Sequence, residues 1–316
     1  MTRQMTVERL ERFDFDGSTQ WALVRGRRQT APVLLLVQAG PGLPMIHEAP
    51  VFEGLEEHYR VVYWDQRGTG KSFDPGANGL LTVGDLVKDL RAMLHALCER
   101  LDVARLEVAG FSLGGSLALL ACAEERDLVR SLVCVGPDVN LLESERFAYA
   151  FALEEARRRG HRRAERALSA IGEPPHEDAK RFMTRVRWVS NFGGIHRGKD
   201  FGAIVRGTLG RLWASPHYSL LEMIGAVRGL GATQERLLPA LQGFDLLAGG
   251  LRVDVPVAIF QGRLDAAAPP HLASALATHL DATLVWFEES AHTPHEEEPR
   301  RFQEALLRFA ATVSGS

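Results

Sequence analysis

The chain has 316 residues, 46% of them hydrophobic and 24% charged, which is the composition of a globular protein with a sizeable core. Its formal charge of −3 gives no electrostatic reason to expect nucleic acid or an anionic membrane as a partner. No window approaches about eighteen uncharged apolar residues, and residues 1–17 lack the apolar core of a secretory signal, so we expect a cytoplasmic protein without a membrane span.

Short segments along the chain have the composition of β-strands. Residues 9–17 and 19–27 roughly alternate between apolar and polar side chains, which predicts an antiparallel pair. Later segments include several that are nearly all apolar, as parallel strands buried on both faces are. These later segments are residues 32–40, 60–68, 105–112, 129–137, 255–263 and 282–290.

Helical patterns separate several of these strands. Thr82 and Asp85 have the spacing of a capping box, and the apolar residues after them fall on one helical face. Residues 271–280 and 300–310 predict two further helices. Strands that alternate with helices predict an α/β fold, with a mostly parallel sheet that helices cover on both sides.

One region interrupts this alternation. Residues 140–251 show no convincing strand pattern and are rich in Arg, Glu, Ala and Leu. We expect this region to be an inserted helical cap that lies over the strand ends. The predicted catalytic domain then comprises residues 1–139 and 252–316. The basic run at residues 156–166 contains Glu165 and directly follows Glu154 and Glu155, which favours a solvated helix face over an anion site.

Two patterns that would indicate nucleotide binding fail on their spacing. Residues 67–72 end like a phosphate-binding loop, but Asp65 holds the position of its first glycine. Residues 110–115 resemble a dinucleotide-binding turn, but Ser112 stands where the pyrophosphate needs a glycine. We therefore expect no cofactor and no metal.

The same residues 110–114 match the pattern Gly-x-Ser-x-Gly, with an apolar strand before them and an apolar helix after them. At such a strand-to-helix turn, a serine is held exposed in a strained backbone, and small neighbours are needed to avoid clashes. The start of the helix also favours an anion at this point. We predict that Ser112 is a nucleophile.

A serine nucleophile needs a base, and the base needs an acid to orient it. His292 follows the last predicted strand and is the favoured base, with His295 as its rival. Asp265 follows the penultimate strand and is the favoured acid, with Asp138 as the alternative from the end of another strand. All of these strand ends meet at the carboxyl edge of a parallel sheet, where such sheets bind ligands.

Acyl transfer also requires two N–H donors for the oxyanion. The backbone of Leu113, directly after the serine, is the first expected donor. The second is Gly40, in a Gly-Pro-rich loop after a predicted central strand, where Pro41 and Pro44 would stiffen the backbone.

Together these features resemble the α/β-hydrolase superfamily, and more narrowly its proline iminopeptidase-like branch. The matching motifs are "QAGPG" (38–42), "DQRGTGKS" (65–72) and "GFSLGG" (110–115), and the resemblance covers roughly residues 5–138 and 252–313. It implies the α/β-hydrolase fold, a mostly parallel eight-stranded sheet with a cap, and a triad of Ser112, Asp265 and His292. It also implies that Asp65 and Arg67 brace the oxyanion loop.

The chain departs from this branch in two places. Gln38 and Ala39 replace a His-Gly pair in the oxyanion loop, and the cap lacks the Trp-rich motif with a glutamate that holds a substrate's amino group. Glu222 is a candidate amine anchor. The candidate walls of the substrate site are the aromatic cap residues Trp188, Phe192, Trp213 and Tyr218.

The favoured function is hydrolysis of a carboxylic ester or lactone of a medium-sized, partly apolar small molecule through an acyl-enzyme on Ser112. A proline iminopeptidase-like aminopeptidase or an amidase is the alternative. An acyltransferase or lyase with the same triad stays open, as does a binding protein that has lost turnover. The sequence does not predict an oligomeric state.

Overall fold

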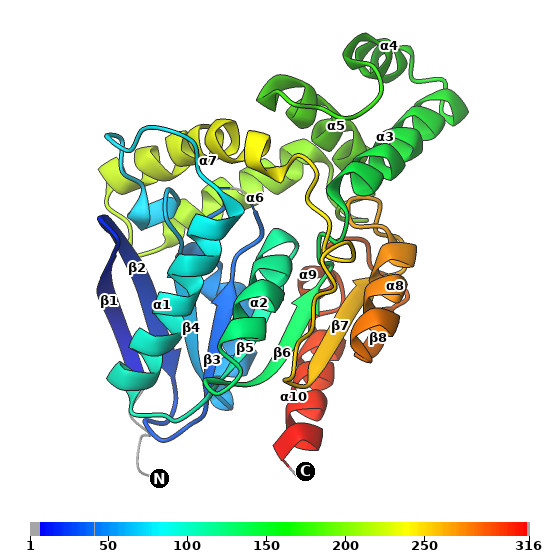
Figure 1. The fold of residues 1–316 in the computed structure, drawn as a ribbon. Coiled ribbons are helices and arrows are strands. Elements are labelled where there is room, and N and C mark those ends of the chain that lie inside the picture. The colour runs from blue at the N-terminus through cyan, green and yellow to red at the C-terminus, as the bar shows by residue number, and fades with distance from the viewer. Residues whose placement is uncertain (1–6, 41, 315–316) are drawn as a thin grey trace.

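The structure is a computed structural model that describes residues 7–40 and 42–314, with Ser314 described by its backbone alone. Its centre is one eight-stranded sheet in the order β1-β2-β4-β3-β5-β6-β7-β8 (Figure 1). The strands are β1 (Val7–Phe15), β2 (Ser18–Gly26), β3 (Val33–Val37), β4 (Arg60–Asp65), β5 (Leu106–Phe111), β6 (Val129–Val135), β7 (Val257–Gly262) and β8 (Thr283–Phe287).

The pairing of the strands confirms the predicted sheet. β1 pairs with β2 and β2 with β4 in antiparallel fashion, whereas every other neighbouring pair is parallel. All residues of β3, β4, β5 and β7 are buried, which explains why these segments are nearly all apolar.

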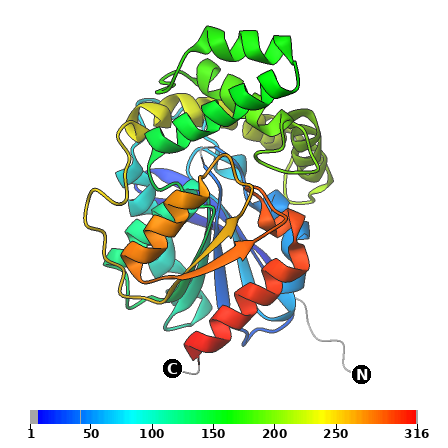
Figure 2. The same ribbon diagram turned by 90° about the vertical axis from the view of Figure 1, so that its right-hand side faces the viewer.

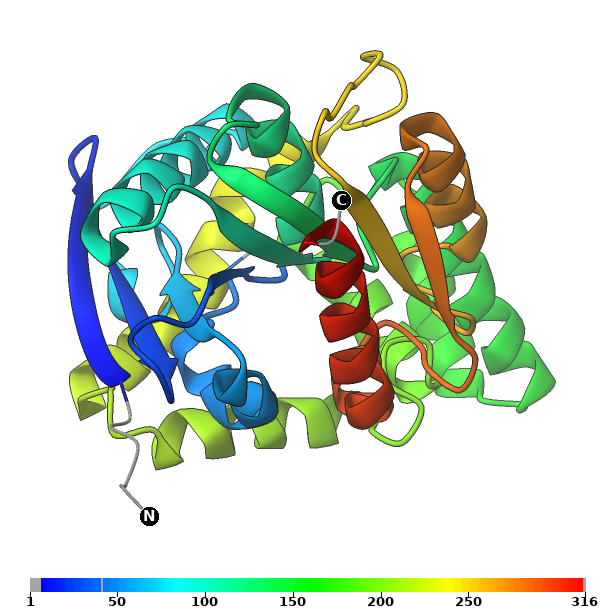
Figure 3. The ribbon, with the colours of Figure 1, turned by 90° about the horizontal axis from the view of Figure 1, so that it is seen from below.

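Helices cover both faces of the sheet, as Figure 3 shows from below. Side chains of α1, α2 and α8 form one core cluster with the sheet, and those of η1 and α10 form another. Their bounds are η1 (Ile46–Glu57), α1 (Val83–Leu101), α2 (Leu113–Glu124), α8 (Pro270–Leu280) and α10 (Pro299–Ser314), and two short segments are η2 (Gly70–Ser72) and α9 (Pro294–Glu297). The core therefore consists of two layers, one on each side of the strands.

The predicted capping box at the start of α1 is confirmed. The Thr82 side chain accepts a hydrogen bond from the backbone N–H of Asp85, and the Asp85 carboxylate accepts one from the backbone N–H of Thr82. Leu90, Met93 and Leu94 then fall on one face and are fully buried. Local sequence fixes where this helix begins, and the apolar face fixes how it docks.

Five helices lie between β6 and β7, in the segment predicted to be the cap, and they lie over the carboxyl edge of the sheet (Figures 1 and 2). They are α3 (Leu141–Arg158), α4 (Arg162–Ile171), α5 (Ala179–Asn191), α6 (Phe201–Ala214) and α7 (Leu220–Leu241). The chain enters and leaves the cap side by side, because Leu141 N–H donates to Phe244 O at 3.1 Å and Leu246 N–H to Val139 O at 2.8 Å.

Within the described part of the chain, no helix combines the length and the apolar character that a membrane crossing requires.

Candidate active site

Ser112 lies at the sharp turn between β5 and α2, with φ 50° and ψ −126°. A Cβ atom at Gly110 would lie 2.5 Å from Gly114 O, and one at Gly114 would overlap the carbonyl oxygen of Gln38. Only glycine fits at both positions, so the two glycines of the motif allow the strand, turn and helix to approach closely. The Ser112 backbone is strained, a state that costs on the order of 1–3 kcal/mol and that clusters at functional sites.

Asp265 and His292 form a hydrogen-bonded pair at the ends of β7 and β8. The distance from His292 Nδ1 to Asp265 Oδ2 is 2.7 Å, and the Asp265 side chain is fully buried. The other carboxylate oxygen of Asp265 accepts from the backbone N–H groups of Ala267 and Ala268, each at 2.8 Å. An ionised carboxylate only accepts, so Nδ1 of His292 carries a proton, and in the neutral ring Nε2 is the nitrogen that can accept one.

The charge of this pair is reflected in the pKa of His292. Burial by itself lowers that pKa, but the charge and the hydrogen bond of Asp265 outweigh burial and raise the pKa to about 9. The Asp265 carboxylate therefore stabilises the imidazolium ion that a general base becomes after it takes a proton.

Gly136 makes room for this pair, a role that the sequence analysis missed. It follows β6 with φ +53°, and a Cβ atom there would lie 3.0 Å from His292 Nδ1 and 3.2 Å from Asp265 Oδ2. A glycine directly after a buried strand and before Pro137 and Asp138 is a signal of such a close approach.

Asp138, the alternative acid, lies beside the serine. Its Oδ2 accepts a hydrogen bond from Ser112 Oγ at 3.3 Å. Among the described residues, Ser112 makes no such bond with His292, so this bond has to form before His292 can take the serine proton. Catalytic hydrogen bonds often form only when substrate binds. Burial raises the pKa of Asp138 to about 6, against the opposing effects of His292 and Ser112.

The loop that carries His292 is held by a second carboxylate that the sequence analysis also missed. Glu297 accepts from the backbone N–H groups of Ala291 at 3.0 Å and Thr293 at 3.3 Å, which flank His292. A glutamate a few residues after a histidine in a loop is a common pattern, so the sequence offered only a weak signal for this role.

The cap contacts the loops that carry Asp265 and His292 through its backbone. His292 N–H donates to Ile195 O, and Ala266 N–H donates to Gly194 O, both at 2.9 Å. These two carbonyls lie between α5 and α6, so a segment of the cap fixes the residues next to Asp265 as well as His292 itself.

The two expected oxyanion donors lie against each other. A Cβ atom at Gly40 would come within 2.7 Å of the Leu113 side-chain atoms Cβ and Cδ2, so glycine is needed for the loop to reach α2. The role of these two N–H groups stays a prediction. Pro41, which was expected to stiffen the loop, lies outside the described residues.

Asp65 braces the segment that follows this loop. Its buried carboxylate accepts from the backbone N–H groups of Met45 at 2.7 Å and Ile46 at 3.0 Å. It also accepts from Lys71 N–H at 2.8 Å and from the Tyr218 hydroxyl at 2.6 Å. Tyr218, expected in the wall of the substrate site, is buried and instead ties the cap to this carboxylate.

Arg67 has a different position from the one that the family resemblance implies. Its guanidinium donates two hydrogen bonds of 2.7 Å to Asp89 of α1 and a longer one to Phe15 O. These contacts join α1 to the end of β1. The expectation that the Arg67 side chain braces the oxyanion loop is therefore wrong. A buried carboxylate on α1 attracts the arginine more strongly than the neutral backbone of the loop does.

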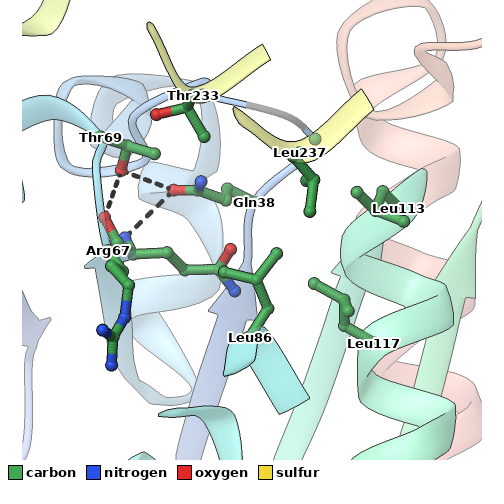
Figure 4. A pocket seen from close by; sticks show the side chains of 11 residues that line it. Gln38, Arg67, Thr69, Leu86, Leu113, Leu117, Thr233 and Leu237 are labelled. Carbon is green, nitrogen blue, oxygen red and sulfur yellow. Dashed lines mark hydrogen bonds between the residues drawn. The ribbon is translucent and has the colours of Figure 1, made fainter. Parts of the chain in front are cut away.

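A small internal cavity beneath the oxyanion loop shows the role of Gln38 (Figure 4). Gln38 Oε1 accepts from Thr69 Oγ1 at 3.2 Å and from the backbone N–H of Gln66 at 3.3 Å. The glutamine that replaces the family's histidine therefore joins the end of β3 to the loop after β4. Leu237 of α7 lines the same cavity, so the cap also closes it.

His295, the rival base, lies in an aromatic cluster. Its ring lies 5.4 Å from that of Phe52 and 4.8 Å from that of Phe111, and burial lowers its pKa to about 4. Its Nδ1 atom is buried and has no hydrogen-bond partner among the described residues. This packing makes it a core residue next to the site.

The remaining aromatic cap candidates have other surroundings than a substrate wall. Trp188 and Phe192 stack with ring centroids 5.8 Å apart inside the core of the cap, and both are buried. Trp213 is 73% exposed on α6, in an apolar groove with residues of α7. Substrate contact by these three side chains stays a prediction that the contacts do not favour.

Glu222, the candidate amine anchor, is already paired. Its carboxylate contacts Lys71 Nζ at 2.5 Å and also forms a capping box with Ser219 at the start of α7. Burial would raise its pKa, but Lys71 and Ser219 outweigh burial and lower it. A carboxylate with a lysine and a helix end as partners has little capacity left for a substrate amine.

Among residues 7–40 and 42–314, no cluster of three or more His, Cys, Asp or Glu side chains has the arrangement of a metal site.

Comparison with known proteins finds similar chains. The chain is 27% identical over 308 residues to a Bacillus subtilis (strain 168) protein named "Probable aminopeptidase YbaC", and the match covers 95% of this chain and 96% of the relative. It resembles the structure of a proline iminopeptidase-related protein from Thermus thermophilus, with a TM-score of 0.65, 20% identity and coverage of 97% and 98% of the two chains.

An esterase from Rhodococcus sp. ECU1013 has the same fold, with a TM-score of 0.62, 18% identity and coverage of 97% of this chain and 99% of the esterase. The family described as "alpha/beta hydrolase fold" matches residues 32–299, which include Ser112, Asp265 and His292. This chain therefore belongs to the alpha/beta hydrolase fold family.

Proposed function

We propose that the protein is a serine hydrolase that cleaves an ester or amide of a small molecule through an acyl-enzyme on Ser112. The observation that carries this proposal is the strained turn that presents Ser112 at the same sheet edge as the Asp265–His292 pair. Membership of the family and the names of its relatives, which include an aminopeptidase and an esterase, support hydrolysis as the type of reaction.

In this mechanism, Nε2 of His292 accepts the proton of Ser112 as its oxygen attacks the substrate carbonyl. The backbone N–H groups of Leu113 and Gly40 bind the oxyanion of the tetrahedral intermediate. His292 then donates the proton to the leaving alcohol or amine, which departs and leaves the acyl group on Ser112. Water, deprotonated by His292, attacks this acyl-enzyme and releases the acid.

The Asp265 carboxylate has two effects in this cycle. Its hydrogen bond to Nδ1 fixes the tautomer and the orientation of His292, and its charge stabilises the imidazolium ion. Its own bonds to Ala267 and Ala268 hold it in place, so the geometry is established before substrate arrives.

The test is hydrolysis of p-nitrophenyl butyrate under single-turnover and steady-state conditions. We expect a burst of p-nitrophenol of about one equivalent per enzyme if deacylation is the slower step. Mass spectrometry of the quenched enzyme should show a butyryl group on Ser112. Turnover that persists in Ser112→Ala would contradict the proposal, and absence of both turnover and acylation would favour a binding protein.

A further inference from the structure

Two helices of the cap, α6 and α7, expose a group of large apolar residues (Figure 1). These seven residues, each between 38% and 79% exposed, form the apolar cap face: Val205, Leu209, Trp213, Leu220, Leu221, Ile224 and Val227. The other exposed large hydrophobic residues of the described chain are Leu80, Phe147 and Leu264, each on a different segment. Single exposed apolar side chains are normal on a protein surface, whereas a contiguous group marks an interaction site.

The sequence of the two helices places these residues in stripes. On α7, Leu220, Ile224 and Val227 have the spacing i, i+4, i+7 with which a helix packs against another helix. Gly231 follows one turn later, and a Cβ atom there would meet nothing within 4 Å, so a second backbone can approach closely. The three residues of α6 follow one another at four-residue intervals. Both helices therefore have the pattern of a packed face, and no described part of the chain covers it.

The apolar cap face contains both a hollow and projecting side chains. A groove of about 410 Å³ lies between the two helices, and buried Leu212 and half-buried Met223 are among the residues that line it. Trp213 and Leu221 of the same face are 73% and 79% exposed, so they project from the surface. A twofold axis brings the same patch of two copies together, and projecting side chains of one copy can then fill the hollow of the other.

The area of the apolar cap face matches what a stable dimer needs. A fully exposed large side chain presents on the order of 150–250 Å², so the seven exposed fractions amount to roughly 700 Å². This area exceeds the roughly 300–600 Å² of the largest apolar patch on a typical monomer. Two copies bury about 1,400 Å² between them, within the range of about 1,200–2,000 Å² for a stable interface.

The charges around this face favour a second copy over an anionic lipid surface. The stretches of α6 and α7 that form it contain four charged residues, and two of these, Arg211 and Glu222, form ion pairs with residues outside the face. That leaves Arg206 and Arg228, whereas binding to anionic lipid takes clusters of about 4–8 basic residues. The formal charge of −3 on the whole chain adds no attraction to such a surface.

We propose that the apolar cap face is a self-association surface, where α6 and α7 of one copy of the chain pack against α6 and α7 of a second copy about a twofold axis. The buried area lies near the lower end of the range for stable interfaces, so the dimer dissociates on dilution. The free energy of unfolding measured in dilute solution then refers to the single chain. Association through this face needs no residue of the candidate triad.

Sedimentation velocity of the full chain over roughly a 100-fold range of concentration tests this association. We expect a monomer–dimer equilibrium with a Kd of roughly 1–100 µM. Leu221→Asp places a carboxylate in the apolar interface, and Trp213→Ser removes its largest side chain. Each should raise the Kd by about 30-fold or more, the effect of a residue central to an interface.

Leu80→Asp is the matched control, because Leu80 is also a leucine, is 71% exposed and lies outside the apolar cap face. The backbone N–H of the next residue, Leu81, donates to Arg236 O, roughly 20 Å along α7 from Leu221. The Kd of this variant should equal that of the wild-type protein. Circular dichroism and urea denaturation in dilute solution should be unchanged in all three variants, so that the change in Kd reports association and not folding.

A wild-type protein that stays monomeric at every concentration would overturn the inference. Leu221→Asp and Trp213→Ser proteins that dimerise as strongly as Leu80→Asp would overturn it as well. Co-sedimentation with phosphatidylglycerol vesicles identifies the other occupant. A wild-type monomer that binds these vesicles, with binding lost in Trp213→Ser, would make the face a lipid-binding surface and contradict self-association.

Discussion

In the sheet, each candidate catalytic residue lies at or just beyond the carboxyl end of a strand, whereas the aromatic candidates of the cap lie on or next to its helices. A parallel strand carries its last side chain to one edge of the sheet, so Ser112, Asp265 and His292 share that edge by topology. A helical side chain can face any direction around its axis, and only the packing of neighbouring helices decides which. Trp188 therefore faces the core of the cap, and Trp213 faces solvent.

The sheet edge holds the residues suited to a reaction, whereas the cap residues named above have structural contacts. At the sheet edge, strand ends converge on one point, and the residues found there bear charges and hydrogen bonds suited to acyl transfer. In the cap, the side chains expected to face substrate are occupied elsewhere: Tyr218 with Asp65, Glu222 with Lys71, and Trp188 with Phe192. The cap contributes structure to the site mainly through its backbone at Gly194 and Ile195.

The largest expected effect tests which carboxylate serves His292. In Asp265→Asn, the amide can donate to Nδ1 and so favours the wrong tautomer of His292, and we expect kcat for p-nitrophenyl butyrate to fall on the order of 10⁴-fold. Asp245→Asn, at the cap junction, is the matched control and should retain activity. A greater loss in Asp138→Asn than in Asp265→Asn would assign the triad acid to Asp138 instead.

The next effect concerns the two cap tryptophans. Trp188 is 6% exposed and Trp213 is 73% exposed. Trp188→Ala leaves a cavity in the cap core and should lower the free energy of unfolding by about 3–5 kcal/mol. Trp213→Ser should change it by less than about 0.5 kcal/mol. Urea denaturation measures both, and equal effects would contradict the assigned positions of the two side chains.

A smaller effect is expected at the contact between cap and loop. Tyr218→Phe removes one donor from the buried Asp65 carboxylate, which should cost about 1–3 kcal/mol of stability. Because Asp65 holds Met45 and Ile46 after the oxyanion loop, kcat should also fall. Tyr149→Phe, whose hydroxyl bonds to Leu168 O within the cap, is the control that should leave kcat unchanged. A fall in kcat of equal size in both variants would contradict a specific effect of Tyr218 on the oxyanion loop.

The smallest effect is a shift in pH dependence. The negative charge of Asp138 helps to raise the pKa of His292, so Asp138→Asn should lower that pKa. Since only neutral His292 can act as a base, the rise of kcat/KM with pH should move to lower pH for a neutral ester. A pH–rate profile of p-nitrophenyl isobutyrate measures this, and a shift toward higher pH would contradict the proximity of the two groups.

The free energy of unfolding should also depend on the protonation of His292. His292 has a pKa of about 9 in the folded protein, against an ordinary value of 6.5. The ion pair with Asp265 therefore contributes its full stabilisation below about pH 6.5 and loses it as the pH rises through 9. His292→Ala should remove this decline in the free energy of unfolding.

Most of the fold was predictable from local patterns. Eight strand segments, the capping box of Thr82 and Asp85, and the helical insertion all follow from hydrophobic period and composition. The need for glycines on either side of Ser112 was also predictable, because the close approach of the backbone there allows no other residue. These features depend on neighbours in sequence or on the general rules of parallel sheets.

The parts that sequence did not predict depend on packing between distant segments. Arg67 forms an ion pair with Asp89 of α1, and His295 packs against Phe52 and Phe111. Both contacts join segments that only the assembled fold brings together. The contact of Asp138 with Ser112 likewise depends on the conformation of the loop after β6, which no local pattern fixes.

The most direct test of the central claim is covalent labelling with a fluorophosphonate probe, with the adduct located by peptide mass spectrometry. We predict one adduct per chain on Ser112, its loss in Ser112→Ala, and strong slowing in His292→Ala, since the histidine activates the serine. Ser116→Ala, four residues further along α2, should still be labelled at Ser112. An adduct on another residue, or a folded wild-type protein that takes up no probe, would contradict the account.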